Sequence, residues 1–183
     1  MESSSNQVVI ECDGFELRTV DLEDAQLYLD FWVRNKEHLR TTGPLYLEPD
    51  YFTLSFWEKR FEYHNANVNS SRFFIYKDGM IIGDIAATNI TRGISNDANL
   101  GYKIDKDYEG KGIMTKAGGE AIKYFFDEVG LHRLQASHLV ENRASARVLK
   151  KLGFTKVGLA PKYLKIYGRY QDHIINQLIN PKH

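Results

Sequence analysis

An Asp-Gly pair between two apolar runs is the feature that most restricts how this chain can fold. Asp78-Gly79 separates residues 73–77 from residues 80–88, and both runs are rich in β-branched and aromatic side chains. Such a pair is the strongest short-range signal for a β-hairpin, because Asp and Gly tolerate the left-handed backbone of a tight turn. The sequence therefore predicts an antiparallel pair of strands here.

Hydrophobic spacing predicts the other elements. Strands are expected over residues 15–20, 98–104, 133–140, 154–166 and 170–179, and helices after Asp21, near 53–65, from 113 to before Gly130, and over 142–152. Strands outnumber helices, and an early hairpin gives way to strand–helix–strand units. The predicted fold class is α/β, with a single-domain mixed, mostly antiparallel sheet and helices on both faces.

Length and composition predict one domain that needs neither disulfide bonds nor a bound metal for stability. A chain of 183 residues can bury roughly 70% of the surface that its unfolded form exposes. Residues 1–12 are expected to form an N-terminal tail and residues 13–181 the domain, with further loose segments at 41–50 and 89–97. Hydrophobic residues at 43% and charged residues at 26% exclude disordered, collagen-like and coiled-coil classes. The single cysteine, Cys12, excludes an internal disulfide and a thiolate metal cluster.

The charges are divided unevenly along a chain whose net charge is zero. Residues 1–100 carry a net charge of −7, and residues 101–183 carry +7. This division is compatible with a cationic ligand on the first half and a polyanionic ligand on the second, and equally with scattered solvated charges.

The strand at 98–104 leads into a glycine-rich turn that opens a helix. Gly110 and Gly112 precede the helix directly, and free N–H groups at a helix start favour a phosphate. The turn is not a Walker loop, because no Gly-Lys is followed by Ser or Thr, and Thr115 occupies the third glycine position of a Rossmann fingerprint. Spacing alone leaves phosphate binding and a plain tight turn open.

This stretch resembles motif A of the GNAT acyltransferases, Q/R-x-x-G-x-G/A between a strand and a helix. Here it reads Glu109-Gly110-Lys111-Gly112-Ile113-Met114, so Glu109 and Met114 depart from the pattern. Further on, Asn142-x-x-Ser145 and Leu152-Gly153-Phe154 are similar to the branch that contains ribosomal-protein-alanine N-acetyltransferases. Leu17-Arg18 and Asp172-His173 extend the resemblance to about residues 14–180.

The resemblance implies acetyl-CoA as co-substrate and assigns residues to it. The cofactor-binding set is Tyr102, Lys103, Ile104, Gly110, Lys111, Gly112, Ile113, Met114, Thr115, Asn142 and Ser145. Among them, the first three would pair through their backbone with the pantetheine arm, and residues 110–115 would hold the pyrophosphate. The acceptor amine is expected over the acidic half, near Trp32, Arg34, Asn35 and His38.

The expected catalytic residues are Ser145 and Asn142. Many GNAT enzymes carry an acidic tyrosine where this chain has Leu149, so the Asn-x-x-Ser pattern suggests Ser145 as the proton donor to the leaving thiolate. A capping role for Asn142 and a solvated first-turn position for Ser145 stay open. Backbone N–H groups of residues 102–104 are expected to stabilise the oxyanion. The sequence does not identify the base.

The predicted function is acetyl-CoA-dependent N-acetylation of a primary amine, with a protein N-terminus as the first expectation. Alternatives are a small amine such as a polyamine, amino sugar or antibiotic, and, from another class, a non-catalytic acyl-CoA-binding module. We expect a cytoplasmic monomer or homodimer without metal, nucleic acid or membrane as partners. His132 and His138 share a strand face but lack a third metal ligand. Gly118 and Gly119 are expected to allow a helix to pack closely on the sheet.

Overall fold

One eight-stranded sheet with the order β1-β2-β3-β4-β5-β6-β8-β7 forms the centre of the computed structural model, which describes residues 7–40, 49–166 and 168–183. Only β5 and β6 pair in parallel, and all other neighbours are antiparallel. The predicted fold class is therefore confirmed. The strands are β1 (Val9–Cys12), β2 (Phe15–Thr19), β3 (Ser71–Lys77), β4 (Met80–Thr91), β5 (Asp97–Ile104), β6 (Arg133–Leu139), β7 (Thr155–Ile166) and β8 (Arg169–Ile179).

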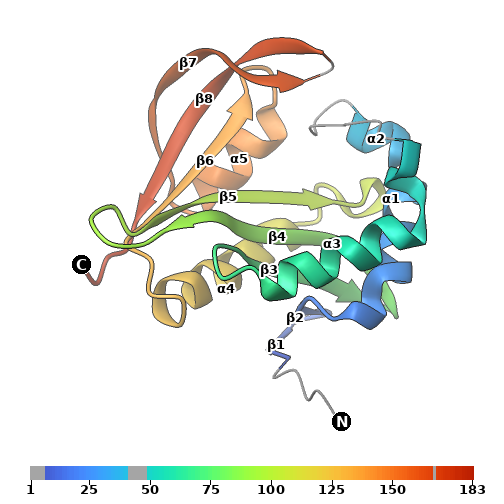
Figure 1. Cartoon of the computed structure of the whole chain (residues 1–183). Coiled ribbons are helices and arrows are strands. Elements are labelled where there is room, and N and C mark those ends of the chain that lie inside the picture. Colours follow the sequence, from blue (N-terminus) through green and yellow to red (C-terminus); the bar gives the residue numbers. More distant parts are fainter. Residues whose placement is uncertain (1–6, 41–48, 167) are drawn as a thin grey trace.

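Helices cover both faces of this sheet (Figure 1). The α-helices are α1 (Ala25–Arg34), α2 (Lys36–Arg40), α3 (Leu54–Ala66), α4 (Ile113–Asp127) and α5 (Arg143–Lys151). Short 3-10 turns are η1 (Leu22–Asp24), η2 (Pro49–Phe52) and η3 (Lys106–Tyr108). The acidic start of the first helix is confirmed: Asp21 and Asp24 form a reciprocal capping box at η1, and α1 follows directly. Helix α2 was not predicted.

The Asp78-Gly79 hairpin forms as predicted. Lys77 pairs with Met80, and both turn residues have positive φ, 51° and 76°. The expected tail, however, is wrong for residues 9–12. These form β1, which pairs with β2 across a second Asp-Gly turn, Asp13-Gly14. The strand is short and at the sheet edge, so its pattern is weak, but the turn itself was a signal that the sequence analysis did not use.

Alternating side chains on the strands build two separate cores. Phe73 and Ile75 belong to the core under α4 and α5, whereas Phe74 and Tyr76 belong to the core under α1 and α3. Because successive strand residues face opposite sides, the continuous apolar run in β3 serves both cores. The central strands are thus buried between two helical layers, whereas β7 is largely exposed, and β5 presents different side chains to each layer.

Strands β5 and β6 separate after a short contact. Their parallel pairing covers only three residue pairs, from Asp97 with Arg133 to Asn99 with Gln135. On its other side β6 pairs with β8 along its whole length, and Figure 1 shows β5 and β6 diverging. From Leu100 onward, β5 has no strand partner on that side among the described residues. An open strand edge therefore lies inside the sheet, beside the start of α4.

Candidate active site

Two left-handed glycines turn the chain from η3 into α4. Gly110 and Gly112 have φ values of 70° and 79°, and a Cβ atom added to either would meet no atom within 4 Å. Gly112 is the N-cap of α4, and its carbonyl accepts hydrogen bonds from the N–H groups of Thr115 and Lys116. Within the described part of the chain, the N–H groups of residues 110–114 make no hydrogen bond. The turn is therefore an open cradle of donors at the positive end of a helix, which fits an anion such as a pyrophosphate.

The open edge of β5 presents the backbone of two residues. The Asp105 N–H donates to the Ile82 carbonyl at 2.7 Å, so this side of Asp105 faces β4. Antiparallel pairing alternates, so Lys103 also directs its backbone toward β4, and Tyr102 and Ile104 direct theirs the other way. The N–H groups of Tyr102 and Ile104 thus line the gap between β5 and β6, where they can bind an extended chain or a developing oxyanion.

Across the gap, the side chain of Tyr102 meets the first turn of α5. Its hydroxyl lies 2.8 Å from Ser145 Oγ and donates to the Ser145 carbonyl at 3.3 Å. Burial raises the pKa of Tyr102 to about 12, so the phenol stays protonated at neutral pH. The Ser145 N–H donates to Asn142 Oδ1 at 3.0 Å, so Asn142 caps α5. The structure brings Tyr102, Asn142 and Ser145 together beside the open edge of β5.

Of the four residues expected near the acceptor, Arg34 and Asn35 are held by polar contacts inside the protein. Arg34 Nε lies 2.6 Å from Asp105 Oδ2, and its Nη2 donates to the Ile81 carbonyl at 2.9 Å. Asn35 is fully buried, donates to Asp105 Oδ2 at 2.9 Å and accepts from the Lys106 N–H at 3.0 Å. These contacts fasten the end of α1 to the end of β5, next to the glycine cradle.

The other two residues, Trp32 and His38, differ in burial. Trp32 is 5% exposed, and its Nε1 has no hydrogen-bond partner among the described residues. His38 is partly exposed, and its Nε2 lies 3.1 Å from Glu109 Oε1. Glu109 therefore points to α2, so the departure from motif A places its carboxylate beside a histidine.

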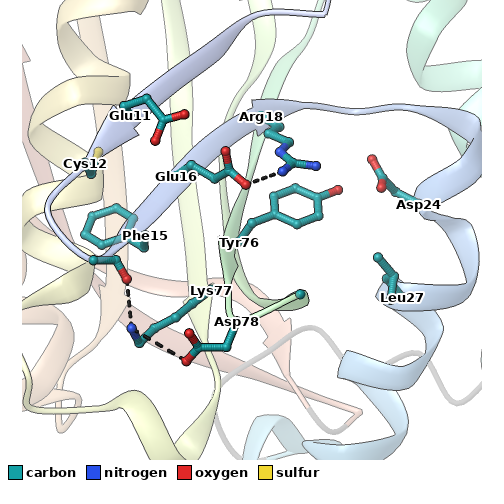
Figure 2. Close-up of a pocket in the computed structure, with 12 residues that line it drawn as sticks. Glu11, Cys12, Phe15, Glu16, Arg18, Asp24, Leu27, Tyr76, Lys77 and Asp78 are labelled. Carbon is teal, nitrogen blue, oxygen red and sulfur yellow. Dashed lines mark hydrogen bonds and ion pairs between the residues drawn. The ribbon is translucent and has the colours of Figure 1, made fainter.

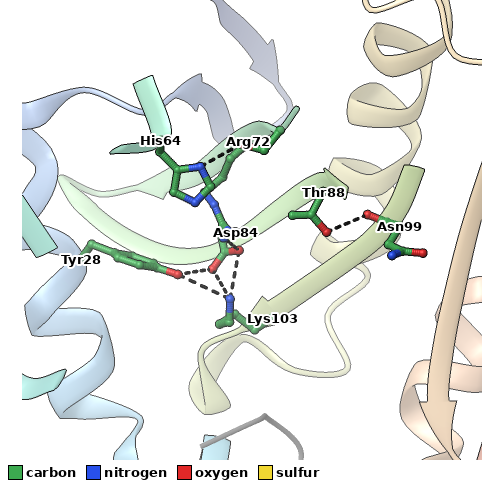
Figure 3. Close-up of polar contacts among 8 residues, drawn as sticks. Tyr28, His64, Arg72, Asp84, Thr88, Asn99 and Lys103 are labelled. Atoms are coloured by element: carbon green, nitrogen blue, oxygen red, sulfur yellow. Dashed lines mark hydrogen bonds and ion pairs between the residues drawn. The ribbon is translucent and has the colours of Figure 1, made fainter. Parts of the chain in front are cut away.

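A buried polar cluster that the sequence analysis missed occupies the α1–α3 face of the sheet. Asp84 on β4 accepts from Tyr28 at 2.6 Å, from Arg72 at 2.5 Å and from Lys103 at 2.8 Å (Figure 3). Burial opposes the charge of Asp84, but Lys103 and Arg72 outweigh it and hold the pKa of that carboxyl below its ordinary value. The available signal was an acid inside an apolar run, because a buried aspartate needs cationic partners.

A surface hollow lies between the β1–β2 turn and the β3–β4 turn (Figure 2). Lys77 there donates to the Gly14 carbonyl at 2.8 Å and lies 3.7 Å from Asp78, and Arg18 pairs with Glu16. None of the residues expected to bind cofactor or acceptor lines this hollow. Its cations are already paired, so it offers no cradle comparable to the one at α4.

The described residues contain no cluster of three or more His, Cys, Asp or Glu side chains arranged to hold a metal ion. No helix in the described part of the chain combines the length and apolar character needed to cross a membrane.

Comparison with known proteins identifies the family. Residues 15–155 match the acetyltransferase (GNAT) domain. The [ribosomal protein uS5]-alanine N-acetyltransferase of Escherichia coli is 30% identical over 184 residues, which cover 98% of this chain and 94% of that protein.

Solved structures agree in fold over the whole chain. The ribosomal-protein-S5-alanine acetyltransferase of Vibrio fischeri superposes with a TM-score of 0.89 at 34% identity and covers 95% of this chain and 97% of its own. RimJ of Mycobacterium smegmatis in complex with CoA-disulfide has a TM-score of 0.87 at 26% identity and covers 96% of this chain and 88% of its own. By sequence and by fold, the chain belongs to the GNAT acetyltransferases and is an N-acetyltransferase.

Proposed function

We propose that this enzyme transfers the acetyl group of acetyl-CoA to the N-terminal amine of a protein, as ribosomal-protein-alanine acetyltransferases do. The observation that supports a protein N-terminus as the acceptor is the similarity of almost the entire chain to the uS5-alanine enzymes of two organisms. Modification of a ribosomal protein would take place in the cytoplasm, by a monomer or homodimer. A metal ion has no assigned role in this proposal.

The geometry of the described residues fits acetyl-CoA. Residues 110–115 would hold the pyrophosphate with free N–H groups, and Tyr102 and Ile104 would hold the pantetheine arm through their backbone. Asn142 and Ser145 would contact the thioester end. Acetyl-CoA supplies an activated acetyl thioester. The structure of M. smegmatis RimJ in complex with CoA-disulfide supports acetyl-CoA as the co-substrate, because the two proteins share a fold.

The residues beside the gap between β5 and β6 would have different roles in acetyl transfer. The N–H groups of Tyr102 and Ile104 would stabilise negative charge on the carbonyl oxygen during attack by the amine. The Tyr102 hydroxyl lies 2.8 Å from Ser145 Oγ, and if it turned its proton from the Ser145 carbonyl to Oγ, the Ser145 proton would be free for the departing sulfur. Asn142 keeps this serine in the first turn of α5, where the helix dipole favours a nearby thiolate. Ser145 is therefore the proposed acid, and Asn142 and Tyr102 are its positioning residues.

The acceptor would approach from the side of α1 and α2. Trp32 and His38 are proposed to line its path, and Trp32 Nε1 offers a buried donor without a partner among the described residues. Arg34 and Asn35 would act indirectly, by fastening α1 to Asp105 at the end of β5.

An acceptor panel tests this function. Release of the CoA thiol should be followed with peptides that begin with a free N-terminal alanine, with the same peptides blocked at the N-terminus, and with spermidine and amino sugars. We expect acetylation of the free peptides and none at the blocked N-terminus. Turnover of small amines alone would assign the enzyme to the small-molecule class instead.

A further inference from the structure

One lysine of β5 points to the face of the sheet opposite the proposed cofactor cradle. Lys103 lies between Tyr102 and Ile104, so its side chain faces α1 and α3 while theirs face the core beneath α4. Its Nζ lies 2.8 and 3.1 Å from the two carboxylate oxygens of Asp84 and 5.4 Å from the centre of the Trp32 ring. The side chain is 24% exposed, so part of it reaches solvent.

This face is the one left for the amine. On the other face, α4 presents the glycine cradle, and the contact of Tyr102 with Ser145 closes the start of α5 over the gap. A thioester held in the gap would therefore meet its acceptor from the α1–α3 side. Beyond Asn99, where β5 has left β6, only Gly101 and Lys103 project to that side, and Lys103 is the ionisable one of the two.

Two cations share a single buried carboxylate at this position. Arg72 on β3 contacts Asp84 Oδ1 at 2.5 Å, and its guanidinium cannot lose its proton at physiological pH. Burial lowers the pKa of Lys103, the Asp84 carboxylate raises it, and Arg72 lowers it again, so the lysine titrates below its ordinary range. One carboxylate thus faces two cations, and Lys103 is the one of the two that can lose its proton.

Asp105, directly after β5 on this face, is bound by Arg34 and Asn35, and the other ionisable groups around Lys103 bring no negative charge. Burial raises the pKa of both Tyr28 on α1 and Tyr51 on η2, so both phenols stay neutral. Burial lowers the pKa of His64 on α3 to about 4, so the imidazole is neutral at pH 7. Arg60 on α3 adds a further positive charge that disfavours the lysine ammonium. Within the described residues, Asp84 is therefore the one anion that Lys103 hydrogen-bonds.

We propose that Lys103, as a neutral amine, is the base that removes a proton from the acceptor ammonium before acetyl transfer. This inference rests on the proposed function. The Lys103 Nζ lone pair forms an N–H bond as one N–H bond of the acceptor breaks, directly or through one water. The acceptor nitrogen keeps the electron pair and uses it to form the C–N bond.

The protons balance over the cycle. The new Lys103 ammonium lies beside Asp84 and returns its proton to bulk water. A second proton leaves the nitrogen once the C–N bond exists and passes through water to the Ser145 oxygen, which has given its own proton to the departing sulfur. One proton is therefore released per turnover. Asp84 cannot take the role of Lys103, because its carboxylate is 1% exposed and already bound by three donors.

Replacement of Lys103 separates proton transfer from charge pairing. Lys103→Arg keeps a cation for Asp84 but cannot deprotonate, and Lys103→Met removes the cation while Arg72 and Tyr28 still satisfy Asp84. We expect both variants to keep the thermal shift with acetyl-CoA and to lose about 100-fold or more in kcat, as for other positioned bases. Lys182→Met, which removes an exposed lysine paired with Asp127, is the matched control and should leave turnover unchanged. Lys103→Arg with wild-type turnover and pH profile would overturn the proposal.

The pH profile supplies a readout that a structural role would not move. Activity should rise as Lys103 loses its proton. Asp84→Asn removes the negative charge that favours the ammonium, so the acidic limb of kcat/KM should move to lower pH. Arg72→Met removes a competing positive charge, so the limb should move to higher pH. An unmoved limb in folded forms of both variants would contradict a role for Lys103 as base.

Direct titration of Lys103 tests the proposal without any acceptor. In NMR spectra of the wild-type enzyme with isotope-labelled lysine, the Lys103 signal is the one missing from Lys103→Arg. It should titrate clearly below the ordinary lysine pKa of about 10.4. Titration at or above that value would overturn the proposal even if no acceptor were found. If the wild-type enzyme acetylated only small amines, the proposed acceptor class would fail, and the Lys103 variants would be compared on those amines.

Discussion

Ser145 is fixed from two directions at the residue scale. Its N–H is bound by Asn142 Oδ1 within α5, and its Oγ is bound by the Tyr102 hydroxyl from β5. The first contact is local, and the second crosses the gap between β5 and β6. A serine so held keeps one rotamer and one direction for its proton, which is what a general acid requires.

Removal of the Ser145 hydroxyl should therefore reduce turnover more than binding. We expect Ser145→Ala to keep its affinity for acetyl-CoA and to lose about 10-fold or more in kcat, the lower bound allowing for water as substitute donor. Tyr102→Phe, which removes only the positioning hydroxyl, should give a smaller loss. Steady-state kinetics and acetyl-CoA titration measure both effects. An equal loss of affinity and turnover in Ser145→Ala would identify Ser145 as a cofactor contact alone.

At the element scale, α4 carries two adjacent glycines that face different surroundings. A Cβ added to Gly118 would lie 2.8 Å from Leu152 Cδ1 just after α5, whereas one added to Gly119 would meet nothing within 4 Å. Close packing is thus confirmed for Gly118, but against Leu152 rather than against the sheet as expected. The glycine sets the approach of the end of α5 to α4, and with it the position of the helix that holds Ser145.

Alanine substitutions should distinguish the two glycines. Gly119→Ala should stabilise the protein by about 0.5–1 kcal/mol, because alanine loses less backbone entropy in a helix. Gly118→Ala should be less stable than Gly119→Ala by about 1 kcal/mol or more, because the new methyl group displaces Leu152. Urea denaturation measures both values, and Leu152→Ala should remove the difference. Equal stabilisation by the two substitutions would show that Leu152 and α5 can shift to accommodate the methyl group without a loss of stability.

At the scale of the whole molecule, the sheet is joined on the β5 side by only a short parallel contact. The division between the acidic and basic parts of the chain, −7 for residues 1–100 and +7 for residues 101–183, falls within β5 itself. A ligand bound along β5, α4 and α5 would therefore connect elements on both sides of the gap. Its binding free energy adds to the stability of the fold as a whole.

Acetyl-CoA should consequently raise the melting temperature. At a hundredfold excess over its dissociation constant, a ligand of the native state adds about 2.7 kcal/mol. For a domain of this size each kcal/mol corresponds to roughly 2–4 °C, measurable by differential scanning fluorimetry. Gly112→Val should abolish the shift, because a β-branched residue cannot easily adopt the positive φ of the cradle. Gly93→Val is the matched control, because Gly93 also has positive φ and open surroundings but lies in the loop between β4 and β5. A full shift in Gly112→Val would place the phosphates elsewhere.

The sequence by itself determined the local structure. Asp78-Gly79 predicted its hairpin, Asp21 with Asp24 predicted the first helix start, and Gly112 predicted the beginning of α4. These features depend on backbone preferences and on contacts within about four residues, which a linear pattern records. The α/β class followed from the order of such elements. The strand at residues 9–12 was not predicted, because an edge strand of four residues shows little hydrophobic periodicity.

Only the tertiary structure decided how the candidate site is assembled. Tyr102 and Ser145 are 43 residues apart, and Lys103 meets Tyr28 from 75 residues away. No local preference specifies these contacts, because they depend on where β5 leaves β6 and on which face each strand residue occupies. A shift of β5 by one residue against β4 would turn Lys103 to the other face of the sheet, away from Asp84. The residue types could be read from the chain, but their meeting depends on strand register and helix packing, which form across the whole fold.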